Sequence, residues 1–514
     1  MSDNTAANRR IAKNTLFLYI RMVFVLLVTL YSSRVLLAEL GVEDFGIYNV
    51  VAGFVSMFGF FNATLSTSMQ RFYNFELGKN GNVSRVYVTG FFLHVAFALV
   101  LFLLLESIGV WYVNNVMVIP SNRLFAANIL FQVSSLSLVF IVIQIPYVGA
   151  IMAYEHLDFY AIVSIVDVIL KLVIVLALPL FSGDKLVTYS ILFSIISIIN
   201  FILYFSFAKR KCPGIVLKSK VSKPLLNSML SFSGWNLVGT FAFTMKGQGL
   251  NLVLNYFFGP VINAARGIAS QVGNAISSFS GSITTSFKPQ LVQSYSMGDT
   301  LRSVRLMFLE SRVCFMLMGI LAAPVVINID LILGIWLGSN NVPEYTSAFT
   351  TLTMVDCLIS SLNAPCTHLT FASGKVKEFQ IGSSIVHLAL LPVALLCLMA
   401  GMNATSVYVI TIIFAVINQF VCIILCNKVV GFGLNNYLHQ VIIPCFVFIL
   451  LLPLFPFLIS LIIKHSITSF LVSTLAVVII GCFLGWFVVL SNSERDKLLT
   501  IGIIAKIHSI FSRQ

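Results

Sequence analysis

The residues of this chain that could do chemistry are charged side chains set inside long apolar stretches. Arg21, Lys171 and Lys246 are the deepest cations, and Asp167 and Asp356 are acids in the same kind of position. A charge at the centre of a membrane-spanning helix costs about 2.5–3.5 kcal/mol, so it normally faces a watery cavity or a partner. These residue types therefore predict an anion-binding surface made by the cations and a proton- or ion-binding site made by the acids.

The cations differ in how deep they lie. Arg21 follows Lys13 by eight residues, about 12 Å along a helix, which is too deep for the side chain to reach the membrane surface comfortably. Arg34 is about 20 Å further along and roughly 220° around the helix, so it either lines the same cavity or extends outward to the surface. Lys246 stands among polar residues and glycines with no acid within one helical turn in the sequence. We expect it to face water, an anion or an acid on another helix.

The acids are the candidates for ion coupling. Asp167 and Lys171 are spaced i and i+4, at which opposite charges meet on a helix. This spacing fits either a neutralising pair or a functional pair in which Asp167 carries a proton. Asp356 has no cation nearby in the sequence, so we expect a partner on another helix or a carboxyl group that binds a proton.

Other reactive residues have ordinary structural explanations. Glu310 and Arg312 fall at the inner end of a predicted span and are expected at the membrane interface, and His368 is expected to be a hydrogen-bonded packing residue. The nine cysteines have neither the paired spacing of a metal site nor a disulfide framework. We therefore predict no metal, no cofactor and no catalytic group.

The composition is that of an integral membrane protein. Hydrophobic residues make up 59% of the 514 and charged residues only 10%, whereas a soluble domain carries about a quarter charged residues. The net charge of +13 does not indicate a nucleic-acid partner, because the basic residues sit in short gaps between apolar runs. Windows of about 20 apolar residues predict fourteen spans, near 15–37, 45–66, 86–106, 124–145, 159–180, 186–207, 231–257, 266–286, 306–327, 347–371, 380–400, 404–426, 438–462 and 468–490.

The distribution of Lys and Arg predicts the orientation. With the N-terminus inside, 22 of the 31 fall in inside segments, 4 in outside segments and 5 within spans, as the positive-inside rule requires. Both termini are therefore predicted to be cytoplasmic. The outside loops are short and leave no room for an extracytoplasmic catalytic domain, which argues against an intramembrane glycan ligase or polymerase.

A basic linker divides the chain into two similar halves. Residues 209–224 hold six basic residues, and Pro213-Gly214 and Pro224 interrupt any helix there. Residues 1–208 and 225–430 are predicted to form two lobes of six spans each. The last two spans and the tail, 431–514, have no counterpart.

Short sequence matches relate the halves. Leu40-Gly41 aligns with Phe258-Gly259 at an offset of 218, and a three-residue insertion then aligns Gly46 with Gly267. Both copies start on the outside, so the halves are predicted to be parallel repeats around a central cavity, related by an axis along the membrane normal.

Three motifs carry a family resemblance. They are Arg9-Arg-Ile-Ala-Lys-Asn-Thr, Leu40-Gly-Val-Glu-Asp-Phe-Gly-Ile-Tyr48, and Gly259-Pro followed by Asn263-Ala-Ala-Arg-Gly-Ile268. With fourteen spans in two lobes, the chain resembles the O-antigen flippases of the multidrug/oligosaccharidyl-lipid/polysaccharide (MOP) exporter superfamily. The resemblance implies a bacterial inner-membrane protein that works by alternating access, with a lipid-linked glycan as substrate and polysaccharide polymerase machinery as a partner. It also implies a role for Arg266, since such flippases carry an important arginine in that region.

Two transport functions remain open. A flippase for an undecaprenyl-diphosphate-linked oligosaccharide needs cations for the diphosphate, and Arg21, Lys171 and Lys246 meet that need. An ion-coupled multidrug exporter of the same superfamily needs buried acids, which Asp167 and Asp356 would supply, although a basic lumen repels a cationic drug.

Overall fold

The computed structural model describes residues 2–78, 81–154, 156–454, 456, 467–492 and 494–496, with side chains from Val23 on except for short stretches such as 60–64 and 231–236. The described residues form helices joined by short turns, without a strand among them. Ten of the described helices are long and apolar enough to cross a membrane. The chain is thus an all-α, multi-pass membrane protein, as the composition predicts, and the count of fourteen spans stays a prediction.

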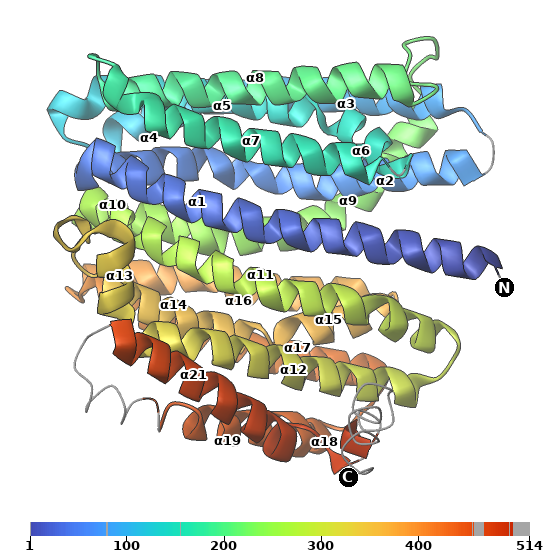
Figure 1. The fold of residues 1–514 in the computed structure, drawn as a ribbon. Coiled ribbons are helices and arrows are strands. Elements are labelled where there is room, and N and C mark those ends of the chain that lie inside the picture. Colours follow the sequence, from blue (N-terminus) through green and yellow to red (C-terminus); the bar gives the residue numbers. More distant parts are fainter. Residues whose placement is uncertain are drawn as a thin grey trace. The chain divides into compact units, whose positions relative to one another are not determined.

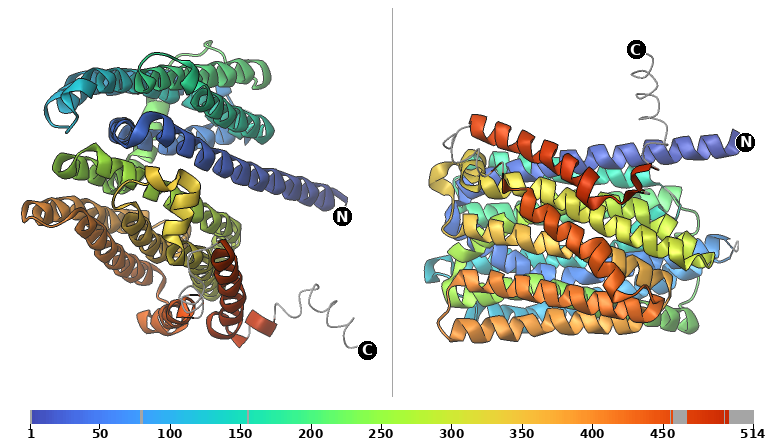
Figure 2. Two further views of the ribbon diagram at one scale, coloured as in Figure 1. Left: turned by 60° about the vertical axis from the view of Figure 1, so that its left-hand side comes forward. Right: turned by 90° about the horizontal axis from the view of Figure 1, so that it is seen from below.

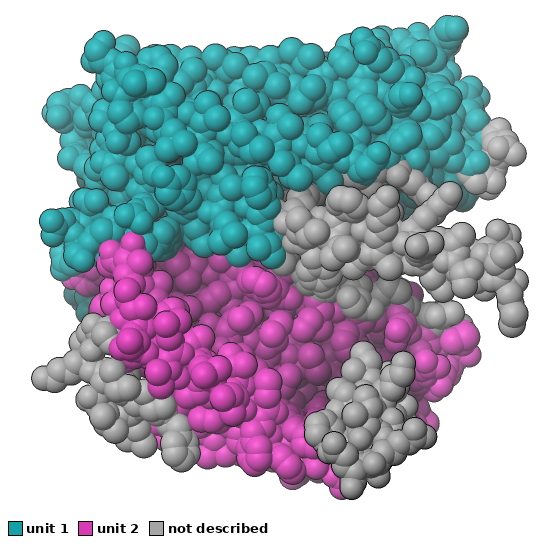
Figure 3. Space-filling view, in the orientation of Figure 1, with its two compact units in different colours: residues 1–267, 336–344, 387–404 teal, residues 268–335, 345–386, 405–514 magenta. Residues whose placement is uncertain are grey.

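The contacts within the chain define two compact units (Figure 3). Unit 1 holds residues 1–267, 336–344 and 387–404, and unit 2 holds residues 268–335, 345–386 and 405–514. Residues 225–267 belong to unit 1 because α9 (Lys223–Thr244) packs against α2 (Phe60–Gly78), and α10 (Leu250–Phe258) against α1 (Ser2–Ser56). The predicted lobes of 1–208 and 225–430 are defined by symmetry rather than by contacts, and they stay a prediction.

Unit 1 is a bundle of long helices that lie side by side (Figure 1), with α8 against α5 and α7 against α1. Its further helices are α3 (Val83–Leu104), α4 (Val110–Asn115), α5 (Leu124–Ile143), α6 (Ile145–Ala153), α7 (Leu157–Ala177), α8 (Lys185–Lys211) and the start of α11 (Pro260–Ser296).

Helix boundaries in unit 1 follow local sequence signals. α1 consists of two helices joined at Gly41, which has φ 76° and ψ 171°, and this break lies between the first two predicted spans. Asp184 caps α8 by accepting a hydrogen bond from the Val187 amide, as expected for an aspartate at this position. Between α9 and α10 the helix contains a π-helical turn at Met245–Gly249.

The basic linker is fastened to unit 1. The carbonyl oxygen of Pro213 accepts a hydrogen bond from Tyr154, the carbonyl of Val216 accepts one of 2.8 Å from Ser84, and the Ser222 amide donates to Thr89 Oγ1 over 3.1 Å. Its six basic side chains are exposed. Its cysteine, Cys212, is buried, and this burial raises the pKa of the thiol to about 11.

Unit 2 is organised around α12 (Thr300–Ile327), which packs against α14, α15, α19 and α21. Figure 2 shows α12 beside α21 from two further directions. The other elements that lie wholly or partly in this unit are α13 (Ile329–Leu337), α14 (Thr346–Ser360), α15 (Asn363–Ala372), α16 (Val376–Met399), α17 (Ala404–Val430), α18 (Leu434–Tyr437), α19 (Ile443–Leu451) and α21 (Ile467–Leu484).

Candidate functional site

The two turns that the repeat aligns have the same backbone conformation. Gly41 has φ 76° and ψ 171°, and Gly259 has φ 75° and ψ −173°. This region of positive φ with extended ψ is essentially restricted to glycine. Gly41 and Gly259, which are 218 residues apart, are therefore equivalent in backbone conformation. Each of them separates two helices.

The glycines that follow these turns are points of close helix contact. A Cβ on Gly46 would lie 1.9 Å from the carbonyl oxygen of Pro260, and one on Gly267 would lie 2.5 Å from Asn49 Oδ1. The aligned pair Gly46 and Gly267 thus lets the second half of α1 approach the start of α11. Small residues serve this purpose between membrane helices.

Four asparagines, Asn49, Asn251, Asn255 and Asn263, form what we call the amide cluster. Asn263 Nδ2 donates to Asn251 Oδ1 over 2.7 Å and to its carbonyl over 2.8 Å, and Asn255 Nδ2 donates to Asn263 Oδ1 over 3.1 Å. Asn251 donates to the carbonyl of Asn49 over 3.0 Å, and Asn255 exchanges two hydrogen bonds with the backbone of Val118. The cluster joins α1, α10, α11 and the loop before α5 at one end of unit 1.

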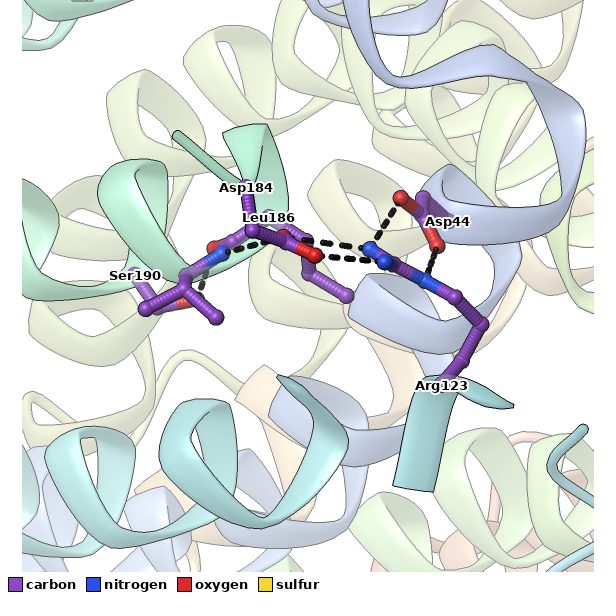
Figure 4. Close-up of polar contacts among 6 residues, drawn as sticks. Asp44, Arg123, Asp184, Leu186 and Ser190 are labelled. Carbon is purple, nitrogen blue, oxygen red and sulfur yellow. Dashed lines mark hydrogen bonds and ion pairs between the residues drawn. The ribbon is translucent and has the colours of Figure 1, made fainter. Parts of the chain in front are cut away.

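Charged residues join neighbouring helices near the Gly41 turn. Arg123 lies between Asp44 and Asp184 and forms ion pairs with both (Figure 4). Its Nε also donates to Asp44 Oδ1 over 2.7 Å, and Lys185 pairs with Glu39 over 2.8 Å. We call these five residues the ionic cluster. The Arg123 guanidinium holds the pKa of the Asp184 carboxyl below its usual value, because it stabilises the charged form.

Lys246 and Arg266 are brought together at the π-helical turn. Lys246 is half-buried in that turn, and Arg266 Nη2 donates to the Gly247 carbonyl over 2.7 Å. His387 lies near Lys246, and its ring packs edge-on against Phe243 at 5.9 Å. We call Lys246, Arg266 and His387 the basic cluster. π-helical turns are frequent at functional sites, and the glycines at 247 and 249 were the only sequence signal for this one.

Asp167 and Lys171 form the ion pair that their spacing predicts. Lys171 Nζ lies 2.8 Å from Asp167 Oδ2, and Asn200 of α8 donates to Asp167 Oδ1 over 2.7 Å. The Lys171 ammonium also lies 4.9 Å from the centre of the Phe193 ring. Both carboxylate oxygens are thus satisfied, and the pair links α7 to α8.

The remaining predicted residues are dispersed. Arg34 is exposed on α1, and Asp356 is half-buried on α14 in unit 2. Arg21 lies on α1, but its side chain is outside the described residues. No group of three or more His, Cys, Asp or Glu that could hold a metal is found among the described residues.

Comparison with known proteins adds evidence at the level of the fold. No family model matches the sequence, and no curated protein matches it. A solved structure of the lipid II flippase MurJ in an inward closed conformation is similar with a TM-score of 0.63 and 13% identity, covering 93% of this chain and 98% of that one. The chain thus has the same overall fold as this flippase structure.

Multidrug transporters share this fold. An inward-facing multidrug resistance transporter of the MATE family, described as a member of the MOP superfamily, has a TM-score of 0.60 and 13% identity over 82% of this chain and 96% of its own. The eukaryotic MATE transporter AtDTX14 has a TM-score of 0.52 and 14% identity over 82% of this chain and 97% of its own. Flippase and multidrug structures are thus both similar to this chain.

Proposed function

We propose that this protein is a flippase that moves an undecaprenyl-diphosphate-linked oligosaccharide, such as an O-antigen unit, across the bacterial cytoplasmic membrane by alternating access. The basic cluster carries this proposal. It places a lysine, an arginine and a histidine around one π-helical turn inside a predicted membrane span. Positive charge held at that depth suits an anionic cargo, because opposite charges attract more strongly in a medium of low dielectric constant than in water.

The geometry of the basic cluster suits a diphosphate. A guanidinium has five N–H donors in a rigid fork, and the bond from Arg266 to the Gly247 carbonyl orients that fork. Arginine binds phosphate with paired hydrogen bonds, and lysine adds a compact charge. Arg21, Arg34 and Lys171 are proposed as further contacts along the path of the headgroup, while the lipid tail stays in the bilayer.

The ends of unit 1 fit a gating role under the predicted orientation. With both termini in the cytoplasm, the turns at Gly41 and Gly259 face the outside. The amide cluster and the contact of Gly46 with Pro260 then close the outside end between α1 and α11. Alternating access requires this contact to break when the cargo leaves.

A second function, ion-coupled export of drugs or other small molecules, is favoured by the multidrug transporters of the same fold. It would use Asp167 and Asp356 as ion-coupling residues or as ligands of a cationic substrate. Asp167 already binds Lys171 and Asn200, so a cation would have to displace both. The flippase proposal rests on the basic cluster rather than on this pair, and polysaccharide polymerase machinery would then be a partner.

The flippase proposal is tested by substitutions that remove the charged side chains of the basic cluster. Lys246→Ala and Arg266→Ala are each expected to lower glycan export about tenfold or more, because a hydrogen bond to a charged group contributes about 1.5–3 kcal/mol. Arg21→Ala should act in the same direction. The measurement is the amount of lipid-linked glycan stranded on the inner leaflet in a deletion strain that expresses each variant.

Lys428→Ala is the matched control, since Lys428 is exposed and pairs with Glu378 on the surface over 2.9 Å. It should export as the unaltered protein does, at equal membrane abundance. Full export by both basic-cluster variants would refute the anionic cargo. A deletion strain that exports its glycan normally but becomes sensitive to cationic drugs would favour the second function.

A further inference from the structure

Unit 2 contains a buried acid that the proposed transport path does not use. Glu310 of α12 is fully buried, and its Oε1 lies 3.1 Å from Nδ1 of His368 on α15. His368 keeps 15% of its side chain exposed. His368 is hydrogen-bonded, as expected, whereas Glu310, which was expected at the membrane interface, is buried within the unit.

The Glu310 carboxylate is incompletely satisfied. Its second oxygen, Oε2, is buried and has no hydrogen-bond partner among the described residues. A buried charged group left in this state is costly, because it has lost its hydration without gaining a replacement hydrogen bond. A purely structural ion pair is expected to use both carboxylate oxygens, as Asp167 does with Lys171 and Asn200.

The next charged residue on α12 has more hydrogen-bond partners than Glu310 has. Arg312, two positions further on, pairs with Glu494 over 2.6 Å and donates to the carbonyl of Val489 over 2.7 Å. It also donates to the carbonyl of Phe308 over 3.3 Å. Arg312 is thus engaged by groups other than Glu310, and it fastens α12 to the segment after α21.

Several titratable groups lie on the elements around Glu310. On the described elements that pack against or bond to α12, they are Lys288 and Tyr295 of α11, Asp356 and Cys357 of α14, Cys366 and His368 of α15, Tyr437 of α18, His439 of the turn at Leu438–Ile442, Cys445 of α19 and Cys482 of α21, with Glu494 beyond it. Of these, His368 bonds to the Glu310 carboxylate. On α12 itself, Cys314 lies about one helical turn from Glu310.

We propose that Glu310 and His368 form a proton-binding site that couples transport to a proton gradient. The proton enters at the exposed edge of His368 and is held between Nδ1 and Oε1, and its binding changes the net charge of the pair from −1 to 0. Proton release is the reverse step. This inference rests on the proposed transport function, because it assigns the site the task of supplying energy.

A proton fits this pair better than a metal cation does. Calcium takes six to eight oxygen ligands and magnesium takes six, whereas the pair offers one carboxylate and one imidazole. Neutralising the carboxylate removes the cost of holding an unpaired charge in the interior. The protonated and deprotonated states therefore differ in how tightly α12 and α15 are held together.

The site can be tested directly by infrared difference spectroscopy of the full-length protein in lipid vesicles. Acidification is expected to produce the carbonyl band of a protonated carboxyl group. Glu310→Gln should abolish this band, and Glu378→Gln, which alters an exposed acid of the same unit, should leave it unchanged. An identical band in the Glu310→Gln protein would overturn the proposal, as would a band that responds to sodium at constant pH.

Because Glu310→Gln could impair folding, His368→Gln provides a second measurement. It keeps the carboxylate and removes its partner, so the pH at which the band appears should shift. An unchanged pH would overturn the pairing.

Glycan export in cells separates this inference from the proposed function. If the band is lost in Glu310→Gln and export also stops, the coupling role is supported. If the band is lost and export continues at the normal rate, the coupling role fails while the flippase stands. If a deletion strain exports its glycan normally, the proposed function fails whatever the infrared result.

Discussion

The turns at Gly41 and Gly259 share one backbone conformation but are stabilised by different chemistry. Around the Gly41 turn the helix ends are joined by the ionic cluster. Around the Gly259 turn they are joined by the amide cluster, whose three members on α10 and α11 are almost fully buried. The two aligned turns therefore share their backbone conformation but not the side chains that stabilise them. One turn depends on charge and the other does not.

The largest effect is expected from breaking the amide cluster. Asn263→Leu removes three hydrogen bonds that join α10 to α11. It takes away the partner of the buried Asn251 Oδ1, at about 1–3 kcal/mol, and one of the two acceptors of Asn255 Nδ2. The measurement is the thermal melting temperature of the purified protein, which should fall at any salt concentration. A melting temperature equal to that of the unaltered protein would show that the cluster does not stabilise this end of unit 1.

Next in size are the turn glycines themselves. Gly41→Ala and Gly259→Ala place a side chain in a region of positive φ, which costs on the order of 1–3 kcal/mol, while neither position has an atom within 3.4 Å of the added Cβ. The two variants should therefore lower the melting temperature by similar amounts. A large difference between them would mean that the surroundings, rather than the shared backbone, determine the cost.

The smallest effect is expected from the ionic cluster. Arg123→Gln removes two partly exposed ion pairs, each worth about 0.2–1 kcal/mol, so the melting temperature should fall slightly, and less at high salt. Because Arg123 holds the pKa of Asp184 below its ordinary 3.8, the contribution of Asp184 is complete above that value and is lost as the pH falls through the lowered one. Unaltered protein and variant should therefore converge in strong acid, and a constant difference down to the lowest pH would exclude the ionic mechanism.

Local patterns predicted the features that depend on neighbouring residues. The Gly41 and Gly259 turns, the Asp167–Lys171 pair and the all-α membrane fold all follow from short-range spacing and composition. Lys246 and Arg266 were each named, but their association was not, because it depends on a π-helical turn that brings the Gly247 carbonyl to Arg266. Pairs such as Glu310 with His368, 58 residues apart, and Arg123 with Asp44, 79 apart, leave no periodic trace in one sequence.

The attachment of the basic linker has a mechanical consequence. Tyr154, Ser84 and Thr89 hold the segment between α8 and α9 at three points, the last of them at Ser222, directly before α9 begins. A linker that is hydrogen-bonded at several points along its length cannot extend freely. Any tilt of α9 during a transport cycle is therefore expected to pivot about Ser222 and Pro224, with the linker before α9 held in place on unit 1.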